Sequence, residues 1–293
     1  MLTYGNAYFS RNFCPVFMKK IYLYLLLCPF IVLSACSKKL KPVEIAKNFY
    51  TARTDSLVNV IEQQQPIVLT DSTGAAIPSE WAATVNFNLR KPNYVIIHYT
   101  AQDSVAQTLR TFTIQRTQVS AHYVVGKNGK VIHMLNDYMR AWHAGVSKWG
   151  NVTDMNSSSI GIELDNKGNE PFAGAQMKSL LILLAQLKRA YNIPQANFIG
   201  HGDIAPGRKP DPGILFPWQQ LADKGFGFYH DAMITEVAPE NFDSTTALRL
   251  MGYDVSNLQA AIQAFKRHFV QIEDTPVLTP CDLDVLYNVY RKY

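Results

Sequence analysis

Two short apolar runs that lie far apart in the chain each end directly in a histidine. Residues 95–97 precede His98, and residues 198–200 precede His201. Apolar runs of this length are typical of buried β-strands, so we expect each strand to place its histidine at the rim of a sheet. This pattern constrains the fold, because two distant segments must deliver side chains to one place.

A carboxylate in a turn-rich loop completes a set of metal ligands. Asp211 lies within the sequence Gly-Arg-Lys-Pro-Asp-Pro-Gly at residues 207–213. Catalytic zinc typically takes three protein ligands with nitrogen or oxygen donors and leaves a fourth position for water. The pattern therefore predicts one Zn²⁺ bound by His98, His201 and Asp211. Two alternatives stay open: nearby Asp203 could be a ligand, and either histidine could be an ordinary core residue.

The middle of the chain predicts an α/β fold. Strand signals alternate with helical signals, and the clearest helix covers residues 175–191, where apolar residues recur on one face. The Asn-Gly pair within residues 127–130 predicts a hairpin turn, which requires antiparallel pairing. Together these signals indicate a mixed central sheet covered by helices, with irregular loops at one rim. The expected strands are residues 94–98, 122–125, 131–135, 160–164 and 197–200.

The two ends of the chain differ from this middle part. Short apolar stripes with helical spacing after residue 238 predict a small C-terminal unit of three helices. Near the other end, residues 43–50 have a helical pattern, and residues 70–74 are typical of a turn between two strands. The three C-terminal stripes are residues 247–251, 258–269 and 283–290.

The N-terminal residues have the features of an export signal. Met18, Lys19 and Lys20 precede an apolar run at residues 21–33, which leads into Leu-Ser-Ala-Cys. The run is shorter than the ~20 residues that a membrane span needs. The pattern resembles a bacterial lipoprotein signal, which implies cleavage before Cys36 and attachment of lipid to that residue.

This interpretation divides the N-terminal region into parts. Residues 1–35 would be removed, residues 1–17 fit no part of a signal and suggest a start placed too early, and residues 36–43 would form a tether. Ser37 does not resemble an inner-membrane retention signal. We therefore expect an exported lipoprotein that is anchored in the outer membrane through Cys36 and faces the periplasm.

Charge and cysteine content exclude two classes of protein. The formal net charge of the chain is +5, and removal of residues 1–35, which contain Arg11, Lys19 and Lys20 but no acid, lowers it to +2. No long basic patch remains, which argues against a nucleic-acid partner. After cleavage only Cys281 lacks a predicted lipid, so no disulfide framework can form within the mature chain.

Five motifs occur in a fixed order: His98, Ala-Trp-His-Ala-Gly at 141–145, Ser-Ile-Gly-Ile-Glu at 159–163, Gly-His-Gly-Asp at 200–203, and residues 207–213. Together they resemble the type 2 N-acetylmuramoyl-L-alanine amidases, which are related to the peptidoglycan recognition proteins. The resemblance covers about residues 91–218 and implies the fold of that family, a zinc cofactor, and peptidoglycan or its fragments as substrate. The implied reaction is hydrolysis of the amide bond between N-acetylmuramic acid and L-alanine.

The chemistry of amide hydrolysis suggests roles for two further residues. Glu163 follows an apolar strand and matches the family's general base, which later acts as an acid. Lys209 lies two residues before Asp211, so an extended loop would point both side chains the same way. It matches the family's lysine that stabilises the oxyanion. Their alternatives are a carboxylate in a structural hydrogen bond and a solvated surface lysine.

Three residues are candidates for substrate binding. Trp142 and His143 lie in a glycine-containing loop that we expect to form a wall of the substrate cleft, although His143 could instead be a packing residue. Arg208 is expected to support its loop or to bind substrate carboxylates. His122 and His133 alternate with apolar neighbours and are interpreted as structural.

The division of the chain and its function leave alternatives. We assign residues 44–237 to the catalytic domain and residues 238–293 to a helical domain that resembles peptidoglycan-binding domains. The usual Asp-Gly turn of such domains is absent, and residues 276–282 stand in its place, so a plain helical appendage is the alternative. The rival functions are a non-hydrolytic peptidoglycan-binding lipoprotein and a zinc peptidase that cuts within the stem peptide.

Overall fold

The computed structural model describes residues 42–63, 69–70, 72–77 and 89–293. The predicted signal peptide, Cys36 and most of the predicted tether lie outside the described residues, as does Asp71 of the expected N-terminal turn. A search of the helices in these ranges finds none with the length and apolar character needed to span a membrane.

A five-stranded mixed sheet forms the centre of the fold, with strand order β5-β4-β6-β3-β7. β3 pairs in parallel with both β6 and β7, and β4 pairs in parallel with β6. The one antiparallel pair of this sheet is the β4–β5 hairpin, whose turn contains Gly129 at φ 81°. This confirms the predicted mixed sheet. The strands are β3 (Tyr94–Tyr99), β4 (Tyr123–Val125), β5 (Val131–His133), β6 (Ser159–Leu164) and β7 (Phe198–Gly200).

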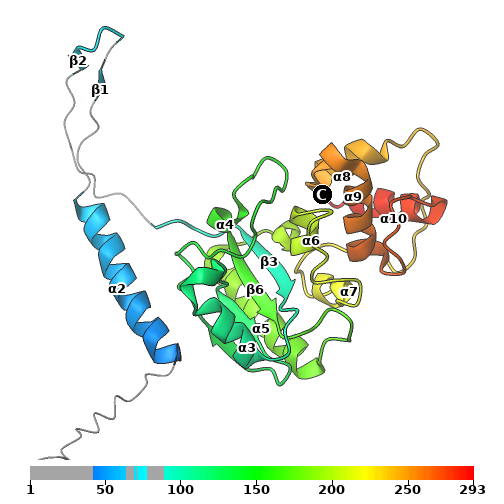
Figure 1. Ribbon diagram of the computed structural model, residues 1–293. Helices are drawn as coiled ribbons and strands as arrows, with labels where there is room; N and C mark the ends of the chain where they lie inside the picture. Colours follow the sequence, from blue (N-terminus) through cyan, green and yellow to red (C-terminus); the bar gives the residue numbers. More distant parts are fainter. Residues whose placement is uncertain (1–41, 64–68, 71, 78–88) are drawn as a thin grey trace, which may run out of the picture. The chain divides into compact units, whose positions relative to one another are not determined.

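Helices follow or connect these strands (Figure 1). A separate two-stranded pair, β1 (Leu69–Thr70) and β2 (Ala76–Ile77), is antiparallel, as the expected turn at residues 70–74 requires. The helices are α2 (Pro42–Glu62), α3 (Val105–Phe112), α4 (Met155–Ser158), α5 (Gly174–Tyr191), α6 (His201–Ile204), α7 (Trp218–Ala222), α8 (Ser244–Met251), α9 (Leu258–Phe265) and α10 (Pro280–Tyr290).

Helix α5 covers one face of the sheet. Its apolar stripe is buried in a core with the inward side chains of β3, β6 and β7, which include Val95, Ile162 and Phe198. The helix ends at Tyr191 because Asn192 takes a left-handed conformation with φ 51°, which asparagine tolerates better than most residues. The buried apolar residues of the stripe are Met177, Leu180, Leu183, Leu184 and Leu187.

The C-terminal helices bury the opposite side of the strands. In β3, Val95 and Ile97 contribute to the α5 core, whereas Ile96 packs into a second core with α8, α9 and α10. Alternate residues of a strand point to opposite faces, so this division follows from the pleat. Leu248, Phe265 and Leu286 of the three helices are fully buried there. The predicted three-helix unit therefore exists and shares its core with the sheet.

Several boundaries differ from the expected ones. Helix α2 continues to Glu62 rather than ending near residue 50, and β5 ends at His133 rather than residue 135. Helices α3, α4, α6 and α7 were not predicted. Three of these four have only four or five residues, which is too short for an apolar period to stand out in the sequence.

Candidate metal centre and active site

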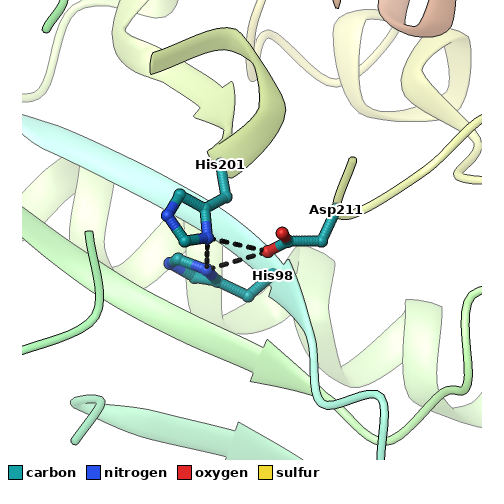
Figure 2. Close-up of side chains that lie close together, drawn as sticks. All are labelled: His98, His201 and Asp211. Atoms are coloured by element: carbon teal, nitrogen blue, oxygen red, sulfur yellow. Dashed lines mark hydrogen bonds and ion pairs between the residues drawn. The ribbon is translucent and has the colours of Figure 1, made fainter. Parts of the chain in front are cut away.

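Three predicted metal ligands converge at one end of the sheet (Figure 2). The Nδ1 atoms of His98 and His201 lie 2.9 Å apart, and Asp211 Oδ2 lies 3.0 Å from each of them. The three residues are only 1%, 3% and 5% exposed, respectively. The structure therefore brings together the residues that the sequence singled out, as a buried cluster of three donor atoms.

The topology explains how residues so distant in sequence meet. His98 lies near the end of β3, two residues after Ile96, and therefore points to the face covered by the C-terminal helices. β7 runs parallel to β3, and His201 is the first residue of α6, directly after β7. The Gly202 N–H donates to the Asp211 carbonyl over 2.7 Å, which holds the Asp211 loop against the same turn.

Hydrogen bonds at the back of each imidazole orient its ring. Nε2 of His201 lies 3.1 Å from the Ala144 carbonyl oxygen, and Nε2 of His98 lies 3.0 Å from Nδ1 of His143. A carbonyl can only accept, so His201 carries its hydrogen on Nε2 and leaves Nδ1 free for a metal. The Ser159 hydroxyl donates to the Met155 carbonyl oxygen and so accepts from His143 Nε2, which leaves His143 Nδ1 to accept from His98 Nε2. Both histidines thus present the correct nitrogen to the cluster.

Electrostatics keep His98 and Asp211 in their metal-binding protonation states. Burial, followed by the neighbouring His201, lowers the pKa of His98 to about 4, so its ring is neutral near pH 7. Burial alone would raise the pKa of Asp211, but the close contacts with His201 and His98 outweigh that effect and hold it below its usual value. The Asp211 carboxylate is therefore ionised.

The donor set fits a zinc ion. Two imidazole nitrogens and one carboxylate oxygen are ligand types of catalytic zinc, and a tetrahedral site with bonds of ~2.0–2.1 Å keeps its ligand atoms roughly 3.3 Å apart. The observed separations of 2.9–3.0 Å need to open by only a few tenths of an ångström. A buried cation would also compensate the buried charge of Asp211.

Glu163 lies beside this cluster. It is the direct neighbour of His98 across the parallel β3–β6 pair, and it points to the same face because Ile162 and Leu164 point to the α5 core. Its Oε2 is buried and has no hydrogen-bond partner in the described part of the chain. Burial raises the pKa of Glu163 well above its usual 4.5, and the charge of Asp211 adds to this increase. A carboxyl group that holds a proton so readily suits acid-base chemistry.

Lys209 contributes positive charge at the same place. Burial dominates the pKa changes of His98 and Glu163, but the ammonium group of Lys209 adds to the lowering at His98 and offsets part of the increase at Glu163. The charge of Lys209 therefore affects both a metal ligand, His98, and the neighbouring carboxyl group of Glu163. The site combines three metal-binding donors, a carboxyl group with a raised pKa and a cation, which together suit hydrolysis of a polar bond.

Comparison with known proteins identifies the family. A family model described as N-acetylmuramoyl-L-alanine amidase matches residues 88–214. The chain is 39% identical over 206 residues to the N-acetylmuramoyl-L-alanine amidase AmiD of Escherichia coli, a match that covers 60% of this chain and 74% of the relative. The chain belongs to the N-acetylmuramoyl-L-alanine amidase family.

Other relatives and solved structures support the same assignment. A 1,6-anhydro-N-acetylmuramyl-L-alanine amidase, AmpD of Haemophilus influenzae, is 40% identical over 108 residues, which are 36% of this chain and 59% of the relative. The structure of E. coli AmiD in complex with the substrate anhydro-N-acetylmuramic acid-L-Ala-D-γ-Glu-L-Lys has a TM-score of 0.62 and 32% identity, and covers 77% of this chain and 98% of AmiD. AmpDh3 from Pseudomonas aeruginosa has a TM-score of 0.64 and 26% identity, with 78% and 99% coverage. The predicted fold and family resemblance are thereby confirmed.

The three residues predicted to bind substrate in this amidase occupy different environments. Trp142 is 50% exposed, so its indole is available to a ligand. His143 is buried, and its two ring nitrogens face His98 and the Ser159 hydroxyl at 3.0 and 3.2 Å. Arg208 donates to the carbonyl oxygens of Ala144 and Val146 over 2.6 and 2.7 Å, so its guanidinium supports the loop next to the metal ligands.

Asp203, the alternative ligand, points away from the other donors. Its Oδ2 accepts from the Gly200 N–H over 2.7 Å and lies 2.8 Å from His268 Nδ1, while its Oδ1 accepts from the Tyr253 hydroxyl over 2.7 Å. These bonds fix the turn that starts at His201. The aspartate thus connects the amidase's metal-ligand turn to the C-terminal helices.

Some residues that support the site were not found by sequence reasoning. The Ala144 carbonyl has no side-chain signature, and Asn156, Tyr253 and His268 received no role from the sequence. Each is buried and bonded to a residue of the metal site or to the loop behind it. Only their unusual burial as polar residues, which requires the fold, reveals them.

Proposed function

We propose that this protein is a zinc-dependent hydrolase that cleaves the amide bond between N-acetylmuramic acid and L-alanine in peptidoglycan or its fragments. One observation carries the proposal: three donors suited to zinc, His98, His201 and Asp211, converge next to a carboxyl group with a raised pKa. Family membership then names the bond, because the relatives' own names specify this amide.

The residues of the site have separate tasks in this reaction. Bound zinc would lower the pKa of water and polarise the scissile carbonyl. Glu163 would accept a proton from the attacking water and then donate it to the departing amine, which leaves poorly as an anion. Lys209 would hold the negative charge that develops on the carbonyl oxygen.

Muropeptides are the proposed ligands of the surrounding surface. Solved relatives were captured with anhydro-N-acetylmuramic acid peptides, and this supports binding of the same class here. The half-exposed ring of Trp142 offers an apolar face to a sugar or peptide. Arg208 would act mainly through the loop that it supports.

Removal of the metal tests zinc dependence. Dialysis against a chelator should abolish hydrolysis of a muropeptide, because water alone is a weak nucleophile near pH 7. We expect one equivalent of Zn²⁺ to restore the activity, whereas Mg²⁺ should fail because it prefers oxygen ligands and octahedral geometry. Full activity of protein from which metal analysis finds no zinc would refute the metal-dependent proposal.

We further propose that the protein is an outer-membrane lipoprotein that faces the periplasm, on the basis of the signal pattern that ends at Cys36. A Cys36→Ala variant should lose labelling by a fatty-acid analogue and should remain unprocessed or become soluble. Cys281→Ala is the matched control, since that cysteine is a free thiol exposed on the folded domain. Lipid labelling that persists without Cys36 would contradict the proposal.

A further inference from the structure

Two consecutive residues, His143 and Ala144, contact the Nε2 atoms of the two histidine ligands, on the side of each ring that faces away from the three-donor cluster. His98 Nε2 lies 3.0 Å from His143 Nδ1, and His201 Nε2 lies 3.1 Å from the Ala144 carbonyl oxygen. His98 comes from β3 and His201 from the start of α6, so one short loop sets the orientation of rings that belong to different elements. Any displacement of this loop would rotate both ligands.

A buried side chain, Asn156, binds the amide groups of this loop, whereas Arg208 binds the Ala144 carbonyl. Asn156 Oδ1 accepts from the backbone N–H groups of both His143 and Ala144, each over 2.9 Å. Asn156 is only 7% exposed and lies on α4, directly before β6. An acceptor shared by two consecutive amides fixes the peptide plane between them, and burial makes loss of that acceptor costly.

Packing around the loop leaves it little freedom. A Cβ on Gly161 of β6 would lie 2.4 Å from the His143 ring, so this imidazole packs directly on the strand backbone. The other ring nitrogen of His143 lies 3.2 Å from the Ser159 hydroxyl. With the ring restrained on both sides, the amide oxygen of Asn156 fixes the two backbone N–H groups of His143 and Ala144.

We propose that Asn156 is a positioning residue of the metal centre, which acts through the His143–Ala144 backbone to aim Nδ1 of His98 and His201 at one metal ion. The inference rests on the proposed function, because it assumes that these three ligands bind zinc. Asn156 itself contacts neither the metal ligands nor the reacting groups through its side chain. Its effect is therefore on metal affinity and ligand geometry.

Three variants separate positioning from simple stability. Asn156→Ala removes the acceptor. Asn156→Asp replaces the amide oxygen with a carboxylate oxygen at the same position, which should preserve both hydrogen bonds to the loop. Asn166→Ala is the matched control: Asn166 is 1% exposed, and its Oδ1 accepts from the Gly168 N–H, so the same truncation disturbs a different loop. All are made in the full-length mature protein.

The measurements are zinc affinity by competition with a fluorescent chelator, the visible spectrum of the Co²⁺-loaded protein, and the thermal midpoint of the metal-free protein. Loss of a partner behind a metal ligand typically costs ~10–100-fold in affinity. We expect that loss and an altered Co²⁺ spectrum for Asn156→Ala, near wild-type values for Asn156→Asp, and a lower thermal midpoint with unchanged zinc affinity for Asn166→Ala.

The outcomes distinguish this inference from the proposed function. If wild type binds zinc and hydrolyses substrate while Asn156→Ala binds zinc equally tightly, the positioning role is refuted and the proposed function stands. If wild type binds no zinc, both fail. Should Asn156→Ala not fold, Asn156→Ser, which shortens the acceptor, must show weakened zinc binding, and wild-type affinity in that variant overturns the inference.

Discussion

Glu163 is the residue on which the proposed chemistry depends most. It lies next to His98 across the β3–β6 pair, and Oε2 has no hydrogen-bond partner among the described residues. A buried carboxyl group without a partner is costly to the fold, and such costs are typical of functional sites. The raised pKa of Glu163 follows from this burial first and from the charge of Asp211 second.

A Glu163→Gln variant should lose most of its turnover and keep its metal. Loss of general acid-base catalysis typically lowers the rate by ~10²–10⁴-fold. The three ligand side chains remain, so zinc content should match wild type. The measurement is kcat on a muropeptide together with metal analysis. Asp282→Asn is the matched control, since Asp282 is a buried carboxylate whose Oδ2 accepts from the Thr279 N–H at the start of α10. Near-normal kcat in Glu163→Gln would remove this residue from the mechanism.

Among the elements, the β4–β5 hairpin carries a buried histidine that links it to β6. The Gly161 N–H donates to His122 Nδ1 over 3.0 Å, and His122 Nε2 lies 3.0 Å from the Met139 carbonyl oxygen. Both ring nitrogens are thus used by neutral imidazole. Burial is the main reason that the pKa of His122 falls to about 4.

The lowered pKa of His122 implies that the free energy of unfolding depends on pH. The folded protein keeps His122 uncharged down to about pH 4, whereas the unfolded chain takes up the proton near pH 6.5. The free energy of unfolding should therefore decrease as pH falls from 6.5 to 4, with a contribution on the order of 3 kcal/mol from this group. Urea unfolding of metal-free protein at several pH values measures it.

The comparison uses two substitutions in the same hairpin. His122→Gln should make the decrease between pH 6.5 and 4 smaller by the contribution of His122, because the unfolded variant has one histidine fewer to protonate. His98, whose pKa is also about 4, contributes equally to wild type and variant. His133→Gln removes a histidine that is exposed on the neighbouring strand and should leave the wild-type slope. Equal slopes in the two variants would show that His122 does not cause the effect.

The elements that the sequence predicted have strong local signals. β3, β6 and β7 are apolar runs, and α5 has a complete apolar stripe, so their periods identify them without tertiary information. α6 has only four residues, and its start depends on Asp203, which is held by Tyr253 after α8 and His268 after α9. Tertiary contacts of this kind leave no local signal.

The same distinction applies to the candidate site. His98, His201 and Asp211 could be predicted because metal ligands belong to few residue types and occur in recognisable motifs. The support behind them could not: the Ala144 carbonyl is available at any residue, and Asn156 is one of many asparagines. The environment of His143, buried behind His98 rather than open to solvent, also depends on packing against Gly161.

At the scale of the whole molecule, the C-terminal helices support the metal centre. Tyr253 and His268 both contact Asp203, and each of the three residues is no more than 3% exposed. The His268 ring also stacks on Trp218, with ring centroids 3.8 Å apart. Whether or not these helices bind peptidoglycan, they complete the support of the His201 turn.

A Tyr253→Phe variant tests this support. It removes one hydrogen bond to the buried Asp203 carboxylate, which should lower the free energy of unfolding by ~1–3 kcal/mol and weaken zinc binding through the His201 turn. Tyr287→Phe is the control, because Tyr287 lies in α10 and its ring packs against Phe242. Thermal unfolding and zinc competition are the measurements. A stability loss without any change in zinc affinity would limit the C-terminal helices to a purely structural role.

The identity of the bond that is cut tests the central proposal most directly. A soluble form comprising residues 37–293 would be incubated with purified peptidoglycan and muropeptides, with and without a zinc chelator, and the released material analysed by mass spectrometry. We predict chelator-sensitive release of free stem peptides that begin with L-alanine. Peptides that leave alanine on the sugar would indicate a peptidase, and binding without any released peptide would contradict the amidase proposal.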